Sequence, residues 1–179
     1  MREIVGSIEG EYRRYKALGE AAIDQLSDEQ LSLVSGSGGN SVTTLVWHIS
    51  GNLASRFTDF LQSDGEKSWR DRDSEFVQRT VSRAELLEKW GKGWTVLFGS
   101  LGDLDDGHLR AIVKIRDQPL TVHEALHRSL AHTSYHVGQM VFLAKALLGT
   151  DWRYLSVPPG GSAGYNKNPV AEKPPGPSR

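Results

Sequence analysis

Four long stretches with apolar residues at three- and four-residue intervals constrain the fold of this chain more than any other feature. They cover about residues 2–26, 41–62, 82–98 and 121–149. This spacing places the apolar side chains on one face of an α-helix. One short alternating stretch, within residues 109–122, favours a small β-hairpin before the last helix. The sequence therefore predicts an all-α fold in which four helices form an antiparallel bundle.

The length and the distribution of proline predict one domain followed by a tail. A chain of 179 residues is long enough to bury a single core. Residues 157–179 contain six of the seven prolines and few large apolar side chains, too little to offset the entropy of ordering them. We predict a helical domain over residues 1–156 and a Pro/Gly-rich tail over residues 157–179.

The composition excludes several kinds of site and partner. The 21 Lys and Arg and the 22 Asp and Glu give a net charge of -1, so no basic excess favours nucleic acid. Without cysteine, the chain has no disulfide or thiolate nucleophile, and a metal would need nitrogen or oxygen ligands. No stretch approaches the roughly 18 apolar residues of a membrane span. We expect a cytoplasmic protein with no nucleic-acid or membrane partner.

Four of the six histidines lie in the last predicted helix, as two pairs spaced four residues apart. The pairs are His123 with His127 and His132 with His136. Such a pair shares one helix face and can give two imidazole ligands to one metal ion. The helical phase places His132 and His136 on the flank of the apolar stripe and His127 toward solvent, with His123 where the helix begins. The second pair is the candidate metal site.

His48, in the second predicted helix, is the candidate for a third ligand, because a site inside a bundle needs a donor from a facing helix. It lies in a polar row away from the large apolar side chains of its helix. The row consists of Thr44, His48, Asn52, Ser55 and Asp59. This row is compatible with a solvated outer face. It is equally compatible with a cleft, where the small residues Gly51 and Ala54 would let another helix approach closely.

Two motifs resemble those of a known superfamily. WHIS around His48 and HTSYHVGQ from His132 to Gln139 are similar to the two signatures of the DinB/YfiT-like superfamily. The segments GNLASRFTDFLQSDGEKSWRDRDSEF and WRYLSVPPGGSAGYN resemble an uncharacterised bacterial branch of it, of the DUF1572 type. The resemblance spans nearly the whole chain. It implies an up-down-down-up four-helix bundle, often dimeric, in which His48, His132 and His136 bind nickel, zinc or iron.

The resemblance implies a metal site but no particular reaction. Characterised relatives are thiol-dependent S-transferases and isomerases that use low-molecular-weight thiols. Three neutral imidazoles leave a divalent ion with open positions, where it can activate water or a thiol. We therefore predict a metal-dependent enzyme that acts on a small-molecule substrate by S-transfer or hydrolysis. The alternatives are a metal-binding module without turnover and a structural bundle whose histidines are incidental.

Further residues are candidates for the surroundings of the metal. Tyr135 and Gln139 adjoin the ligands on their helix, and Asn52 and Arg56, with Asp59 beyond them, could orient a substrate. The loop at residues 65–80 carries carboxylates that could supply a fourth ligand and close the site. These carboxylates are Glu66, Asp71, Asp73 and Glu75.

Large aromatic side chains also predict a homodimer. Trp90, Trp94, Phe57 and Phe60 carry more apolar surface than a small bundle readily hides, which favours a second copy of the chain as partner.

Overall fold

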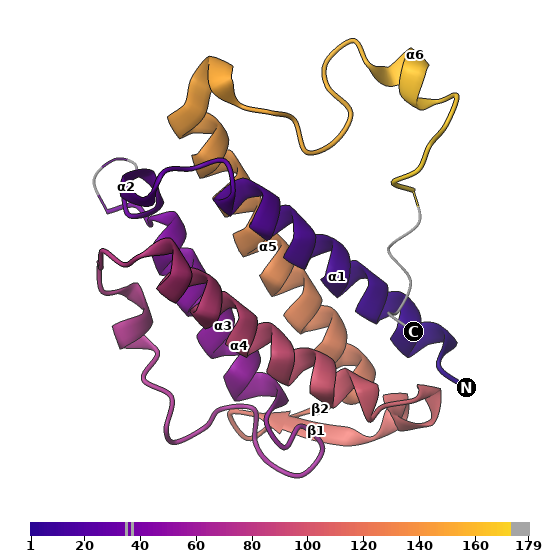
Figure 1. The fold of residues 1–179 in the computed structure, drawn as a ribbon. Helices are drawn as coiled ribbons and strands as arrows, with labels where there is room; N and C mark the ends of the chain where they lie inside the picture. Colours follow the sequence, from indigo (N-terminus) through magenta and orange to yellow (C-terminus); the bar gives the residue numbers. More distant parts are fainter. Residues whose placement is uncertain (35, 37, 173–179) are drawn as a thin grey trace.

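The computed structural model describes residues 1–34, 36 and 38–172. Four long helices pack side by side and a two-stranded sheet lies at one end of them (Figure 1). The long helices are α1 (Glu3–Ile23), α3 (Val42–Phe57), α4 (Arg83–Gly102) and α5 (Val122–Leu148). The shorter elements are α2 (Asp28–Leu31), η1 (Asp73–Phe76), η2 (Asp106–Arg110), β1 (Ile112–Ile115), β2 (Gln118–Thr121), η3 (Gly149–Asp151) and α6 (Ser162–Tyr165). The mostly helical fold and the small hairpin are confirmed.

Short polar side chains begin three of the long helices. The hydroxyls of Ser41, Ser82 and Thr121 each accept a hydrogen bond from the backbone N–H three residues later, which satisfies a donor that has no partner within the helix. Helix α3 ends at Phe57, earlier than the apolar pattern predicted. The backbone takes a positive φ of 47° at Asp59, which an α-helix cannot accommodate.

The β-hairpin is tied to the segment that follows α3. Its turn residues Arg116 and Asp117 both have positive φ, at 56° and 59°, as a tight two-residue hairpin turn requires. The carboxylate of Asp64 accepts hydrogen bonds from the backbone N–H groups of Arg116 at 2.8 Å and Asp117 at 2.7 Å. This contact holds the hairpin tip beside the C-terminal end of α3.

The large aromatic residues lie inside the single chain. Trp90 and Trp94 are each 1% exposed, Phe57 is 2% exposed and Phe60 is 7% exposed. Trp94 makes an edge contact with the Tyr12 ring at a centroid distance of 6.3 Å, a favourable aromatic geometry. The argument for a homodimer from these side chains is therefore wrong, because the bundle buries them without a second copy.

The segment after α5 lies apart from the ends of the helices where the hairpin packs. Arg14 on α1 donates a hydrogen bond to the Ala171 carbonyl oxygen at 2.7 Å, which ties this segment to α1. Residues 173–179 of the predicted tail lie outside the described residues. Among the residues described, no helix combines the length and the apolar character needed to cross a membrane.

Candidate metal centre

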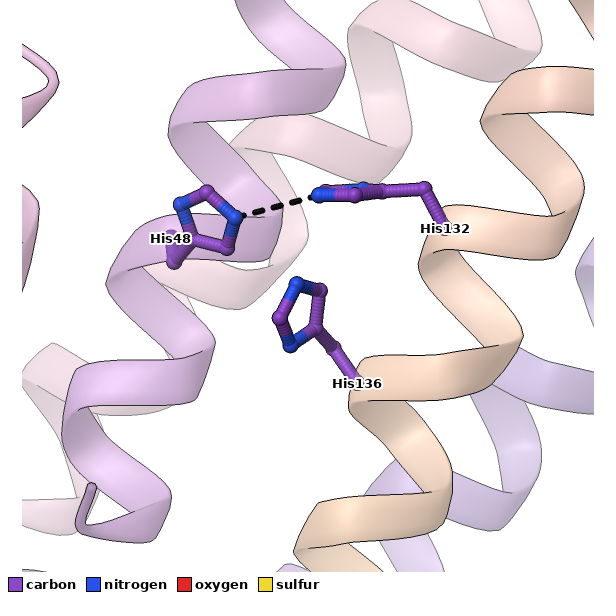
Figure 2. Close-up of side chains that lie close together, drawn as sticks. All are labelled: His48, His132 and His136. Carbon is purple, nitrogen blue, oxygen red and sulfur yellow. Dashed lines mark hydrogen bonds between the residues drawn. The ribbon is translucent and has the colours of Figure 1, made fainter. Parts of the chain in front are cut away.

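Three histidines meet between α3 and α5. His48 comes from the middle of α3, and His132 and His136 come from successive turns of α5. One ring nitrogen of each lies within 4.8 Å of the others, and the Nε2 atoms of His48 and His132 are 3.1 Å apart, within hydrogen-bond distance. Figure 2 shows the three rings pointing toward one another. The fold thus brings the predicted residue His48 to the predicted pair His132 and His136, although His48 and His132 are 84 residues apart in the sequence.

The cluster fits a divalent metal ion. Imidazole nitrogens bind zinc at about 2.0–2.1 Å, so two ligands of one ion lie at most about 4 Å apart. The 3.1 Å separation of His48 and His132 satisfies that limit, and small side-chain movements would bring in His136. His132 Nδ1 is buried and has no hydrogen-bond partner in the described part of the chain, which is uncommon for a buried polar atom. The three-histidine group can therefore hold a metal ion.

Burial keeps the two histidines of α5 neutral. It lowers the pKa of His132 to about 3, and the nearby His136, His48, Arg70 and Arg56 contribute to this shift. Burial also lowers the pKa of His136, against the opposing effect of its hydrogen bond to Gln139. Near pH 7 both rings therefore carry no charge and have a lone pair available for a metal ion.

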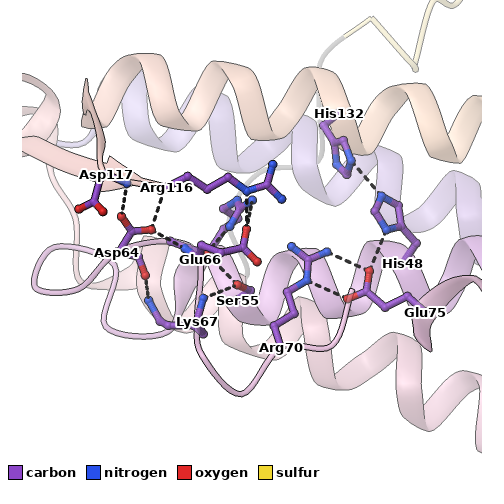
Figure 3. A network of polar contacts seen from close by, with 12 residues as sticks. His48, Ser55, Asp64, Glu66, Lys67, Arg70, Glu75, Arg116, Asp117 and His132 are labelled. Atoms are coloured by element: carbon purple, nitrogen blue, oxygen red, sulfur yellow. Dashed lines mark hydrogen bonds and ion pairs between the residues drawn. The ribbon is translucent and has the colours of Figure 1, made fainter. Parts of the chain in front are cut away.

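Glu75 orients the His48 ring from the side opposite the cluster. His48 Nδ1 donates to Glu75 Oε2 at 2.9 Å, which leaves Nε2 facing His132 (Figure 3). Arg70 holds the same carboxylate through two hydrogen bonds of 2.8 and 2.9 Å. Burial acts to raise the pKa of Glu75, but the hydrogen bonds from His48 and Arg70 and the Arg70 charge outweigh it, so the pKa lies below its ordinary value.

The loop at residues 65–80 thus contributes a supporting carboxylate. None of its four carboxylates joins the group of possible ligands, as far as the described residues show. The sequence argument missed the roles of Glu75 and Arg70, because nothing in GEKSWRDRDSEF distinguishes this Glu–Arg pair from the other charges of the loop.

Gly51 makes room for the Glu75 carboxylate. A Cβ atom at Gly51 would lie 2.1 Å from Glu75 Oε1 and 2.8 Å from its Cδ. The element that approaches Gly51 is thus the short helix η1 and not one of the four long helices. A carboxylate from η1 occupies that space, because η1 packs directly on α3.

Replacing Gly51 by alanine should weaken metal binding without removing a ligand. The new methyl group would displace Glu75, and loss of a carboxylate behind a metal-bound histidine typically lowers affinity about 10–100-fold. A chelator competition titration measures the change. Gly138→Ala is the matched control, since a Cβ at Gly138 on α5 meets nothing within 4 Å. Equal affinities of the two variants would contradict the role given to Gly51.

His136 has hydrogen-bond partners on its own helix. Its Nδ1 lies 2.8 Å from Gln139 Oε1, and Gln139 Nε2 donates to the Tyr135 hydroxyl at 3.2 Å. The Tyr135 side chain is otherwise exposed. Gln139 therefore fixes the ring of His136 much as Glu75 fixes the ring of His48. The hydrogen bond from Gln139 to Tyr135 extends this network to the surface.

A cavity of about 770 Å³ opens beside the histidines. All three line it, together with Asn52 and Arg56 from the following turns of α3; Asp59 is not among its lining residues. The polar row of α3 is buried at Thr44, His48, Asn52 and Ser55. The cleft interpretation is thus correct for His48 and Asn52, which line the cavity, whereas Asp59 is exposed and lies beyond the end of α3.

The other histidine pair of α5 lies away from the cluster. His123 and His127 are both exposed, and their rings lie 4.2 Å apart, centroid to centroid. Their exposure agrees with the helical phase, which placed His127 toward solvent and His123 where the helix begins.

Comparisons with known proteins support the fold and identify the family. A conserved protein from Enterococcus faecalis, known from its crystal structure, aligns with a TM-score of 0.67 and 17% sequence identity, covering 83% of this chain and 99% of that one. At that identity the likeness shows the fold alone. A search of curated proteins finds no match. The model of the DUF1572 family, described as proteins of unknown function, matches residues 1–161. Since this match spans most of the chain, the protein belongs to the DUF1572 family.

Proposed function

We propose that the protein is a divalent-metal-dependent enzyme of the DinB-like type. His48, His132 and His136 would hold nickel or zinc, with iron as a further option, and the reaction would be S-transfer or hydrolysis of a small molecule. The observation that carries the proposal is the convergence of three imidazoles on the wall of a cavity of about 770 Å³. The up-down-down-up helix order and a homodimeric state belong to the proposal through the resemblance alone.

The donor set favours catalysis over a purely structural role. The described chain offers three imidazole ligands and no carboxylate in the same group, a pattern typical of catalytic sites, which keep a position for water or substrate. When bound, the ion would lower the pKa of a water or thiol ligand toward neutrality. Because the chain has no cysteine, a thiol would have to come from a small molecule.

The surrounding side chains would position the substrate. Asn52 is buried, lines the cavity and has no hydrogen-bond partner within the described residues, so its amide is free to bind a ligand. Phe57, Phe60 and Phe76 form an apolar wall of the cavity that reduces access of bulk water. Arg56 lines the same cavity, where its guanidinium is held by the Gly65 carbonyl and Glu66.

An open coordination position is testable with cobalt as the probe metal. The Co²⁺-loaded protein should change its visible absorption when azide is added. With 2-mercaptoethanol it should gain a thiolate-to-metal charge-transfer band. Both changes should saturate and should be absent from chelator-treated protein. A Co²⁺ spectrum that neither compound alters would favour a closed metal-binding module. No Co²⁺ binding at all would favour the structural bundle.

A further inference from the structure

Five arginines surround the cavity beside the histidines. These arginines come from α3, the 65–80 loop, the hairpin turn and α5. No Asp or Glu is among the described residues that line the cavity. They are Arg56, Arg70, Arg72, Arg116 and Arg128. The whole chain has a net charge of only -1, so the positive charge is concentrated at this cavity.

Two carboxylates offset part of this charge. Figure 3 shows Glu75 bound by Arg70 and Glu66 bound by Arg116. The single Oε2 atom of Glu66 accepts from both Arg56 at 3.2 Å and Arg116 at 2.9 Å. Three positively charged guanidinium groups thus share two carboxylates, so the carboxylates do not neutralise all of their charge.

The remaining two arginines have no comparable partner among the residues that the structure describes. The nearest carboxylate to Arg72 belongs to Asp73, at 3.8 Å, and the Asp73 side chain is 99% exposed, so this ion pair is strongly screened by solvent. Arg128 makes no ion pair or side-chain hydrogen bond within the part of the chain described. Guanidinium groups are well suited to bind carboxylate or phosphate through two parallel hydrogen bonds.

The two arginines are placed close to the histidines. Arg128 precedes His132 by one turn of α5, so the two side chains share a helix face. The Arg72 guanidinium lies 4.9 Å above the Phe76 ring, and that ring in turn packs on His48 at a centroid distance of 4.7 Å. A ligand in the cavity could therefore contact a guanidinium and the histidine cluster at the same time.

We infer that the cavity binds a small organic anion, whose carboxylate or phosphate group contacts Arg72 and Arg128 and whose apolar part packs on the phenylalanine wall. The assignment of this anion as substrate rests on the proposed function. The anion site itself depends only on the arginines, and it is testable without a metal.

Calorimetric titration of chelator-treated protein tests the site with three probes of similar size. Benzoate and phenyl phosphate should bind, and neutral benzyl alcohol should bind at least tenfold more weakly. Arg72→Gln and Arg128→Gln should each weaken the two anions about tenfold, because each removes a charge-assisted hydrogen bond. Comparison of benzoate with phenyl phosphate distinguishes a carboxylic acid from a phosphate ester as the preferred class.

Two controls separate this inference from the metal site. Arg110→Gln removes an arginine of η2 that does not line the cavity, and anion binding should remain unchanged. Chelator-treated wild-type protein is the second control: it should bind the anions although it holds no metal, so a failure of metal binding would leave this result unchanged. The inference would be overturned by benzyl alcohol binding as tightly as benzoate, or by Arg110→Gln weakening the anions as much as Arg128→Gln does.

Discussion

Replacing any one of His48, His132 and His136 by alanine is expected to abolish retention of a divalent ion, which the wild-type protein should hold at about one per chain. Each substitution leaves only two imidazoles, and the described residues provide no carboxylate in the group that could replace the third. The loss should exceed the roughly 10–100-fold that follows removal of a supporting residue. Elemental analysis of protein loaded with Ni²⁺ or Zn²⁺ and passed through a desalting column measures it.

The double variant His123→Ala/His127→Ala is the matched control for this result. It removes a pair with the same four-residue spacing from the same helix, but that pair is exposed and lies outside the cluster. Its metal content should equal that of the wild type. If the control lost its metal while His132→Ala kept it, the assignment of the two pairs would be reversed.

Gly93→Ala is expected to lower the free energy of unfolding by about 2–3 kcal/mol, as overpacking of a tight interface does. A Cβ at Gly93 on α4 would lie 2.6 Å from the Ser50 Cα of α3. That contact is with backbone, so rotation of a side chain cannot relieve it. The two helices are also joined there by a hydrogen bond of 2.5 Å from Ser50 Oγ to the Lys89 carbonyl oxygen. The thermal midpoint should fall by roughly 5–10 °C.

Gly91→Ala, in the same helix, is expected to change the free energy of unfolding in the opposite direction. A Cβ at Gly91 meets nothing within 4 Å, so alanine should stabilise the protein by about 0.5–1 kcal/mol through its higher helix propensity. Thermal unfolding followed by circular dichroism compares the two variants. Destabilisation of similar size in both would show that the close approach at Gly93 does not determine the result.

Much of the helical architecture follows from local chemistry that the sequence displays directly. The apolar spacing predicts the long helices, and the hydroxyl side chains at residues 41, 82 and 121 mark where three of them begin. The distinction between the two histidine pairs of α5 is also local, because one helix phase determines which pair lies near the apolar stripe. The metal-ligand candidates on that helix could therefore be chosen without any tertiary information.

The remaining features depend on contacts between segments that lie far apart in the sequence. The polar row of α3 could face solvent or a cleft, and only the packing of α5 and the 65–80 loop against α3 places His48 and Asn52 of that row on the wall of a cavity. Glu75 and Gly51 acquire their roles because η1 packs on α3. The tryptophans are hidden because the helices enclose enough volume for them. Spacing along one helix defines its faces, but which segment covers each face depends on the free energy of packing the whole chain.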